Sequence, residues 1–189
     1  MAGYIGGKAV NLSTSGADIG GTANLDIIDV DGAANFAADV TFADGADIIT
    51  ASAGTSNFRA GVNAGNSIAS GGNYNVVVGD EAGTAITTGD QNVAIGFGAA
   101  SALSTGANIV AIGYLAGDAI TTGENNIAIG KNALGAEDTH DFNIAIGSNA
   151  LAVQNAGADA YNIAIGHNAG TAVTTGTSNT LIGGLAGDA

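Results

Sequence analysis

The sequence has no cysteine and no proline, and only three basic residues stand against 17 acidic ones in 189 positions. Without cysteine, neither a disulfide framework nor a thiolate metal site can form. The net charge of −14 argues against a nucleic-acid partner, because phosphate contacts need Lys and Arg side chains. It also disfavours binding to an anionic membrane surface.

Large side chains and long apolar runs are scarce as well. Aromatic residues make up 5% of the chain although 46% of it is hydrophobic, which predicts a thin core built from small aliphatic side chains. No apolar run approaches the roughly 18 residues that cross a bilayer, so we expect no membrane insertion. The amino end, Met1–Lys8, also lacks the apolar stretch of a secretory signal.

Glycine is abundant, with 32 residues, and much of it belongs to a repeat. The segment N-I-A-I-G at Asn126–Gly130 returns along the chain with small changes. A fixed period of this length indicates a repeat architecture. The extra residues Ala160 and Tyr161 are expected to absorb the one longer step. The closing glycines of the repeats are Gly79, Gly96, Gly113, Gly130, Gly147, Gly166 and Gly183, which gives steps of 17, 17, 17, 17, 19 and 17 residues.

Each repeat favours strands and corners over a helix. Glycine inside a helix costs about 0.8–1.0 kcal/mol relative to Ala, and glycines recur in every repeat. In Ile127-Ala128-Ile129 the two Ile side chains would lie on one face of a strand and Ala128 on the other. The glycine that follows permits a sharp corner. The second apolar patch, such as Ala85–Gly89, indicates a shorter strand and another corner. We therefore predict an all-β, parallel β-roll or β-solenoid of about eight 17-residue coils.

The third and fourth positions of the repeat lie on opposite faces, and we assign one face to the inside of the roll. The branched fourth position is predicted to fill the core, with Val78, Ile95, Ile112, Ile129, Ile146, Ile165 and Ile182. The small third position is predicted to face outward. A strip of small apolar side chains on the outside suggests contact with further copies of the chain. The predicted subunit contacts are Val77, Ala94, Ala111, Ala128, Ala145, Ala164 and Leu181.

The first part of the chain does not follow the repeat. Short runs of alternating hydrophobicity are separated there by turn-forming pairs, Asp31-Gly32 and Asp44-Gly45. We predict that residues 1–55 form an irregular region of short β-strands that contacts another protein. Residues 56–189 are then the solenoid shaft.

Residues able to carry chemistry are few and scattered. His140 and His167 lie in different corners of their coils. Glu137, Asp138 and His140 replace the usual apolar patch of one coil and, together with Asp141, are able in principle to bind a metal. A solvated irregular corner is the favoured interpretation, and we expect no metal site and no cofactor.

The adjacent acids Asp80 and Glu81 would point in opposite directions on an extended chain. That is poor geometry for the paired carboxylates of a glycoside hydrolase. We expect no catalytic residues and no enzymatic activity.

The repeat N-x-A-I-G-x-x-A resembles the head repeats of YadA-like trimeric adhesins, which form left-handed parallel β-rolls in homotrimers. The longer coil with T-T-G at its second corner, as in Asn162–Gly176, is similar to repeats in tail fibres of marine phages, especially cyanophages. The segments Met1–Gly6, Ala23–Asp26 and Val30–Gly32 also resemble the amino ends of such fibres.

This resemblance implies a homotrimeric tail or neck fibre of a virion, exposed to the extracellular medium. A tail, neck or adaptor protein of the particle would hold the region 1–55, and a receptor on the host surface is a possible partner of the shaft. The main alternative is a head fragment of a bacterial trimeric adhesin. A glycan-cleaving tailspike and an ice-binding solenoid remain further alternatives.

Overall fold

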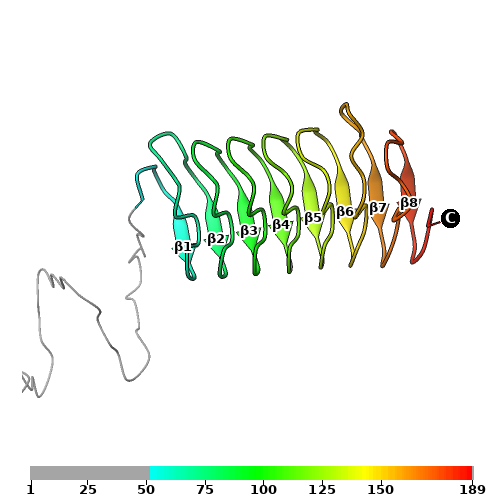
Figure 1. Cartoon of the computed structure of the whole chain (residues 1–189), viewed down its shortest axis with the longest axis horizontal. Helices are drawn as coiled ribbons and strands as arrows, with labels where there is room; N and C mark the ends of the chain where they lie inside the picture. Colours follow the sequence, from blue (N-terminus) through cyan, green and yellow to red (C-terminus); the bar gives the residue numbers. More distant parts are fainter. Residues whose placement is uncertain (1–51, 189) are drawn as a thin grey trace, which may run out of the picture. The chain divides into compact units, whose positions relative to one another are not determined.

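The computed structural model describes residues 52–188, which form a parallel β-solenoid with a repeat of about 17 residues (Figure 1). One short strand from each coil joins a single sheet of eight parallel strands, in the order of the sequence. This part of the chain contains no helix. The predicted all-β solenoid class is therefore confirmed.

Nearly all of the predicted region 1–55 lies outside the described residues. The strands are β1 (Phe58–Ala60), β2 (Val76–Val78), β3 (Val93–Ile95), β4 (Val110–Ile112), β5 (Ile127–Ile129), β6 (Ile144–Ile146), β7 (Ile163–Ile165) and β8 (Thr180–Ile182).

The strands pair so that equivalent repeat positions stand directly above one another. Ala111 of β4 is opposite Ala128 of β5, and Ala128 is opposite Ala145 of β6. The register is kept across the long coil, where Ala145 pairs with Ala164 of β7. Columns of equivalent repeat positions therefore run along the whole stack.

The predicted second strand of each coil is absent from the described residues. The segment around Thr87 forms turns, although its backbone still bonds to the next coil: Thr87 N donates to Ser104 O (2.9 Å), and Ser104 N donates to Thr121 O (2.8 Å). A turn in which Ile86 N donates to Gly83 O (3.1 Å) closes just before this segment. Too few extended residues remain there to form a strand.

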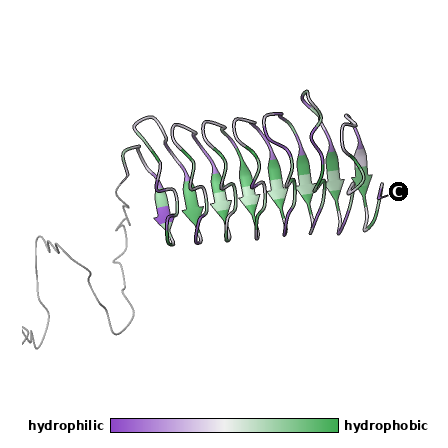
Figure 2. Ribbon diagram, in the orientation of Figure 1, coloured by the Kyte–Doolittle hydropathy of each residue, from purple (hydrophilic) through white to green (hydrophobic). Residues whose placement is uncertain are grey.

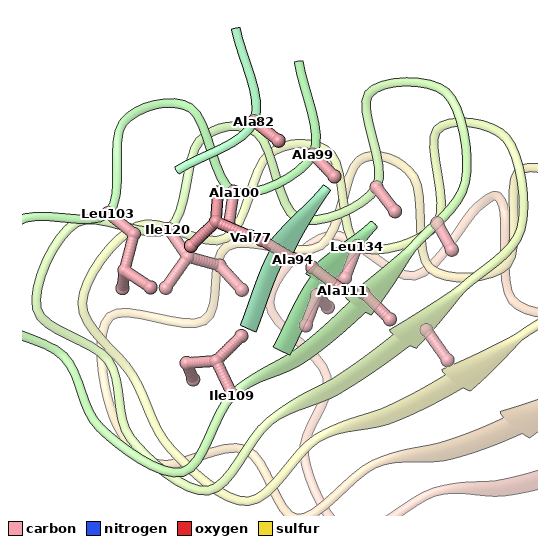
Figure 3. Packing of buried hydrophobic residues seen from close by; sticks show 14 of the residues in the cluster. Val77, Ala82, Ala94, Ala99, Ala100, Leu103, Ile109, Ala111, Ile120 and Leu134 are labelled. Atoms are coloured by element: carbon pink, nitrogen blue, oxygen red, sulfur yellow. The ribbon is translucent and has the colours of Figure 1, made fainter. Parts of the chain in front are cut away.

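The predicted assignment of inner and outer faces is wrong. The third position lies inside the roll, where Val77, Ala94, Ala111, Ala128, Ala145 and Ala164 are completely buried within a single chain and Leu181 is partly buried. These residues are therefore not available for subunit contacts. Figure 3 shows Val77, Ala94 and Ala111 in the buried cluster with Leu103 and Ile120.

The size of the coil explains why the small residues face inward. A methyl group added at Gly117 would lie 3.0 Å from Ile120 Cδ1, 3.6 Å from Ala128 Cβ and 3.7 Å from Ala111 Cβ. The repeat fills its narrow interior with a large twelfth residue, such as Ile120, and small third and eighth residues. At Ala111 and Ala128, where the interior is this narrow, a branched side chain would overfill the space. The buried eighth-position residues are Ala64, Ala82, Ala99, Ala116, Ala133, Ala150 and Ala169.

The fourth position, predicted to be the core, lies on the outer face of the sheet. Ile129 and Ile146 are half-buried by their neighbours, whereas Ile165 and Ile182 are 37% and 69% exposed. The same correction applies to the rest of the predicted core column, Val78, Ile95 and Ile112, which are also only half-buried.

The predicted corner glycines are confirmed. All seven have a φ between +121° and +142°, a region that residues with a Cβ rarely adopt. A Cβ at Gly113 would lie 2.8 Å from the backbone carbon of Gly130 in the next coil. Both the backbone conformation and the close stacking of coils therefore require glycine there.

An asparagine ladder that we did not predict joins the coils at the first repeat position. Asn92 Oδ1 accepts the backbone N–H of Ile109 in the next coil (2.9 Å), while its Nδ2 donates to Gly106 O (2.9 Å). Asn92 thus links two coils and ties down the second corner of its own coil. The same pair of bonds is made by Asn57, Asn75, Asn126 and Asn162, whereas Asn143 Nδ2 donates to Asp141 O (3.4 Å). The buried members are Asn57, Asn75, Asn92, Asn126, Asn143 and Asn162.

The extra residues of the long coil are not Ala160 and Tyr161, as predicted. Ser178 N donates to Ala160 O (2.7 Å), as Asn108 N does to Asp90 O (3.1 Å), so Ala160 holds a regular repeat position. Asn155, whose N–H donates to Thr174 O (2.7 Å), is also in register. The insertion therefore lies within residues 156–159, in the loop that projects beyond the others after β6 (Figure 1).

Candidate interaction surface

The outer face of the sheet is an uninterrupted surface of branched aliphatic side chains. The second and fourth positions of the repeat are the first and last residues of each three-residue strand. Both point outward because side chains alternate along a strand. Figure 2 shows that hydrophobic residues predominate along strands β2–β7. We call this surface the outer aliphatic face and define it as Val76, Val78, Val93, Ile95, Val110, Ile112, Ile127, Ile129, Ile144, Ile146, Ile163, Ile165 and Ile182.

Two exposed aromatic stacks lie at opposite ends of the strands. Phe97 and Tyr114 follow β3 and β4, with ring centroids 5.5 Å apart and planes 12° apart. Phe142 and Tyr161 precede β6 and β7, with centroids 5.0 Å apart and planes 6° apart. These four rings are between 41% and 54% exposed. We did not single out these rings from the sequence, although Phe97 and Tyr114 are one 17-residue step apart and Phe142 and Tyr161 are one 19-residue step apart.

Some acidic corner residues accept backbone hydrogen bonds from an adjacent coil. Asp90 Oδ1 accepts the N–H of Asn73 (2.6 Å), and Asp141 Oδ1 accepts the N–H of Glu124 (2.6 Å), each linking adjacent coils. Asp118 is half-buried, and burial raises the pKa of its carboxyl above the usual 3.8.

The adjacent acids Asp80 and Glu81 are also tied to the neighbouring coil. Asp80 Oδ1 accepts the N–H of Val62 (3.1 Å), and Glu81 Oε1 accepts from Asn63 Nδ2 (2.8 Å). Glu81 has a positive φ of 60°. Their carboxylates thus stabilise the stacking of coils at this corner.

The corner at residues 137–140 differs from the expected solvated corner. Glu137 is completely buried, and its Oε1 lies 2.6 Å from Nδ1 of His140. Asp138 Oδ1 lies 3.9 Å from the same nitrogen, and the ligand atoms of these three residues are all within 4.8 Å of one another. His167, the other histidine, is exposed and lies in a different corner.

No protein-family model, curated protein or solved structure matches this chain. Within residues 52–188, no helix has the length and apolar character needed to cross a membrane.

Proposed function

We propose that this chain is a non-enzymatic structural subunit of a homotrimeric virion fibre, a tail or neck fibre. Its solenoid shaft projects toward the host surface, and its amino-terminal region, residues 1–55, attaches to a tail, neck or adaptor protein. The observation that carries the proposal is the outer aliphatic face. The number of subunits and the viral setting come from the resemblance of the repeat to trimeric adhesin heads and phage fibres.

The outer aliphatic face favours association with copies of the same chain. Leaving branched side chains in water forgoes burial that is worth about 25 cal/mol per Å² of apolar surface. Equivalent residues recur at every coil, so a parallel copy presents the same columns at the same spacing. Self-association is the most common way to bury such a face.

The remaining surface opposes further aggregation. The chain carries a net charge of −14, and exposed acids such as Asp80 and Glu124 lie in the corners away from the strands. Charge repulsion keeps such surfaces apart. Contacts between subunits are thereby restricted to the apolar side, which suits a discrete fibre.

The mass of the full chain in solution tests the assembly. We expect three times the chain mass of 18.0 kDa by light scattering or native mass spectrometry. Ile129→Glu places a charge on the outer aliphatic face and should prevent assembly, because burying an unpaired charge is costly. Thr122→Glu adds the same charge at an exposed corner of the preceding coil and should leave the trimer intact. A folded wild-type monomer at micromolar concentration would contradict the proposal.

The location of the chain tests the viral role separately. Antibodies against residues 56–189 should label the tail or neck of purified particles in electron micrographs. Labelling of bacterial cell envelopes without labelled particles would instead favour the adhesin alternative. Release of reducing ends from host polysaccharide by the purified fibre would contradict the absence of enzymatic activity.

A further inference from the structure

One column of the core changes from apolar to polar in the middle of the stack. The twelfth repeat position is occupied by Ile86, Leu103 and Ile120 in three consecutive coils, and by Glu137 and Gln154 in the next two. All five side chains are completely buried. Glu137 Oε2 and both polar atoms of the Gln154 carboxamide have no hydrogen-bond partner. Since buried polar groups nearly always have partners, these atoms point to a missing ligand.

The free oxygen of Glu137 belongs to a group of metal-binding side chains. Its second oxygen, Oε1, lies 2.6 Å from His140 Nδ1, and Asp138 Oδ1 lies 3.9 Å from that nitrogen. The three residues offer one imidazole nitrogen and two carboxylates within 4.8 Å of one another. Imidazole and carboxylate together suit zinc and its neighbours, whereas calcium and magnesium prefer oxygen ligands alone.

Gln154, in the next coil, adds a side-chain oxygen at the same repeat position as Glu137. Asn155 Nδ2 donates to Ala136 O (3.2 Å), which stacks the corner that carries Gln154 on the corner that carries Glu137. Both side chains point into the roll, because neither is exposed. The unpartnered carboxamide of Gln154 therefore lies in the coil next to the unpartnered Glu137 oxygen.

His140 occupies a repeat position that is glycine in the regular coils. In the regular coils the fifteenth position is glycine, and a Cβ at Gly106 would lie 2.4 Å from Gly123 O. His140 holds this position, and Asn126 Nδ2 donates to its carbonyl oxygen (2.8 Å) as Asn92 does to that of Gly106. The following corner contains the insertion, and no atom lies within 4 Å of a Cβ built at Gly157. The histidine and the insertion thus occur together in adjacent coils.

We propose that Glu137, Asp138 and His140 bind a divalent first-row transition metal of the zinc type, which cross-links this corner of the solenoid. Zinc bonds of about 2.0–2.2 Å place tetrahedral ligand atoms roughly 3.3 Å apart. To reach this separation, the distance between Glu137 Oε1 and His140 Nδ1 has to increase from 2.6 Å. The distance between His140 Nδ1 and Asp138 Oδ1 has to decrease from 3.9 Å. The sequence-based expectation of no metal assumed a solvated corner, and the burial of Glu137 removes that assumption.

Calorimetric titration of the metal-free full chain with Zn²⁺ tests the site. We expect saturable binding of one ion per chain and a higher midpoint of thermal unfolding in the presence of zinc. Co²⁺, used as a spectroscopic probe, should give visible absorption bands that Zn²⁺ removes by competition.

Two variants separate this site from adventitious binding. The double variant Glu137→Ile, His140→Gly restores the residues of the regular coil at Ile120 and Gly123, so it should stay folded and lose saturable binding. His167→Ala removes the exposed histidine and should bind like the wild type. The proposal is overturned if the wild type shows no saturable binding, if the double variant binds equally well, or if His167→Ala abolishes binding.

Discussion

Asn92 Oδ1 accepts the backbone N–H of Ile109 at 2.9 Å, across the boundary between two coils. The amide of the same side chain donates to Gly106 O at 2.9 Å. One buried side chain therefore links two coils and closes the second corner of its own coil. Ile109 offers no such acceptor, so the ladder stops at that coil and resumes at Asn126, which bonds to Asn143 N at 2.8 Å.

Asn92→Ala should destabilise the solenoid substantially. It leaves the N–H of Ile109 and the carbonyl of Gly106 without side-chain partners in a buried place, and each such loss costs about 1–3 kcal/mol. Denaturant unfolding followed by circular dichroism measures the change. Thr88→Ala, at an exposed position, should change stability by less than about 0.5 kcal/mol. Equal effects of the two substitutions would contradict a structural role for the ladder.

Ala128→Ile should overfill the interior of the roll. Ala128 is completely buried and faces Gly117, where a Cβ would lie 3.6 Å from Ala128 Cβ, so the added carbons have no room. The expected loss is about 1–3 kcal/mol in the free energy of unfolding. Thr122→Ile places the same side chain at an exposed corner of the preceding coil and should have little effect. If Ala128→Ile is tolerated as well as Thr122→Ile, the inner column is assigned incorrectly.

Gly113→Ala should be more harmful than Gly183→Ala. Both glycines have similar φ values, +132° and +124°, so both substitutions incur backbone strain of about 1–3 kcal/mol. Only at Gly113 does the new Cβ also meet the next coil, at 2.8 Å from Gly130, whereas nothing lies within 4 Å at Gly183. Thermal unfolding of the two variants measures the difference, which reports the tight stacking of coils. Equal unfolding midpoints of the two variants would show that the contact with the next coil adds no destabilisation to the backbone strain.

Asp118→Asn should stabilise the protein at neutral pH. Burial raises the pKa of Asp118 above 3.8, so the ionised carboxylate disfavours the folded state. The folded state binds the proton more tightly than the unfolded state does, and the stability that protonated Asp118 provides is lost as pH rises through its folded-state pKa. The advantage of the variant should therefore shrink as pH is lowered. Unfolding midpoints of both proteins at a series of pH values give the measurement, and an advantage that grows toward acid would contradict the sign.

The sequence alone was enough to predict the repeat, the parallel solenoid and the seven corner glycines. These features depend on local properties of each repeat: its period, the β-branched residues of segments such as Ile127–Ile129, and the glycine that ends them. The alternation of Ile129 and Ala128 was also predictable, because side chains alternate along any strand.

Only the tertiary structure decided which of these faces lies inside. Alternation separates Ile129 from Ala128 but does not say which one points inward, and the usual preference for large residues in a core favoured the wrong side. The interior volume of the coil settles the choice. Once Ile120 occupies the twelfth position, only a methyl group fits at Ala128, so the larger Ile129 is directed outward. The burial of Glu137 likewise depends on the stacking of coils, because packing between coils and not local sequence decides whether a corner side chain is covered.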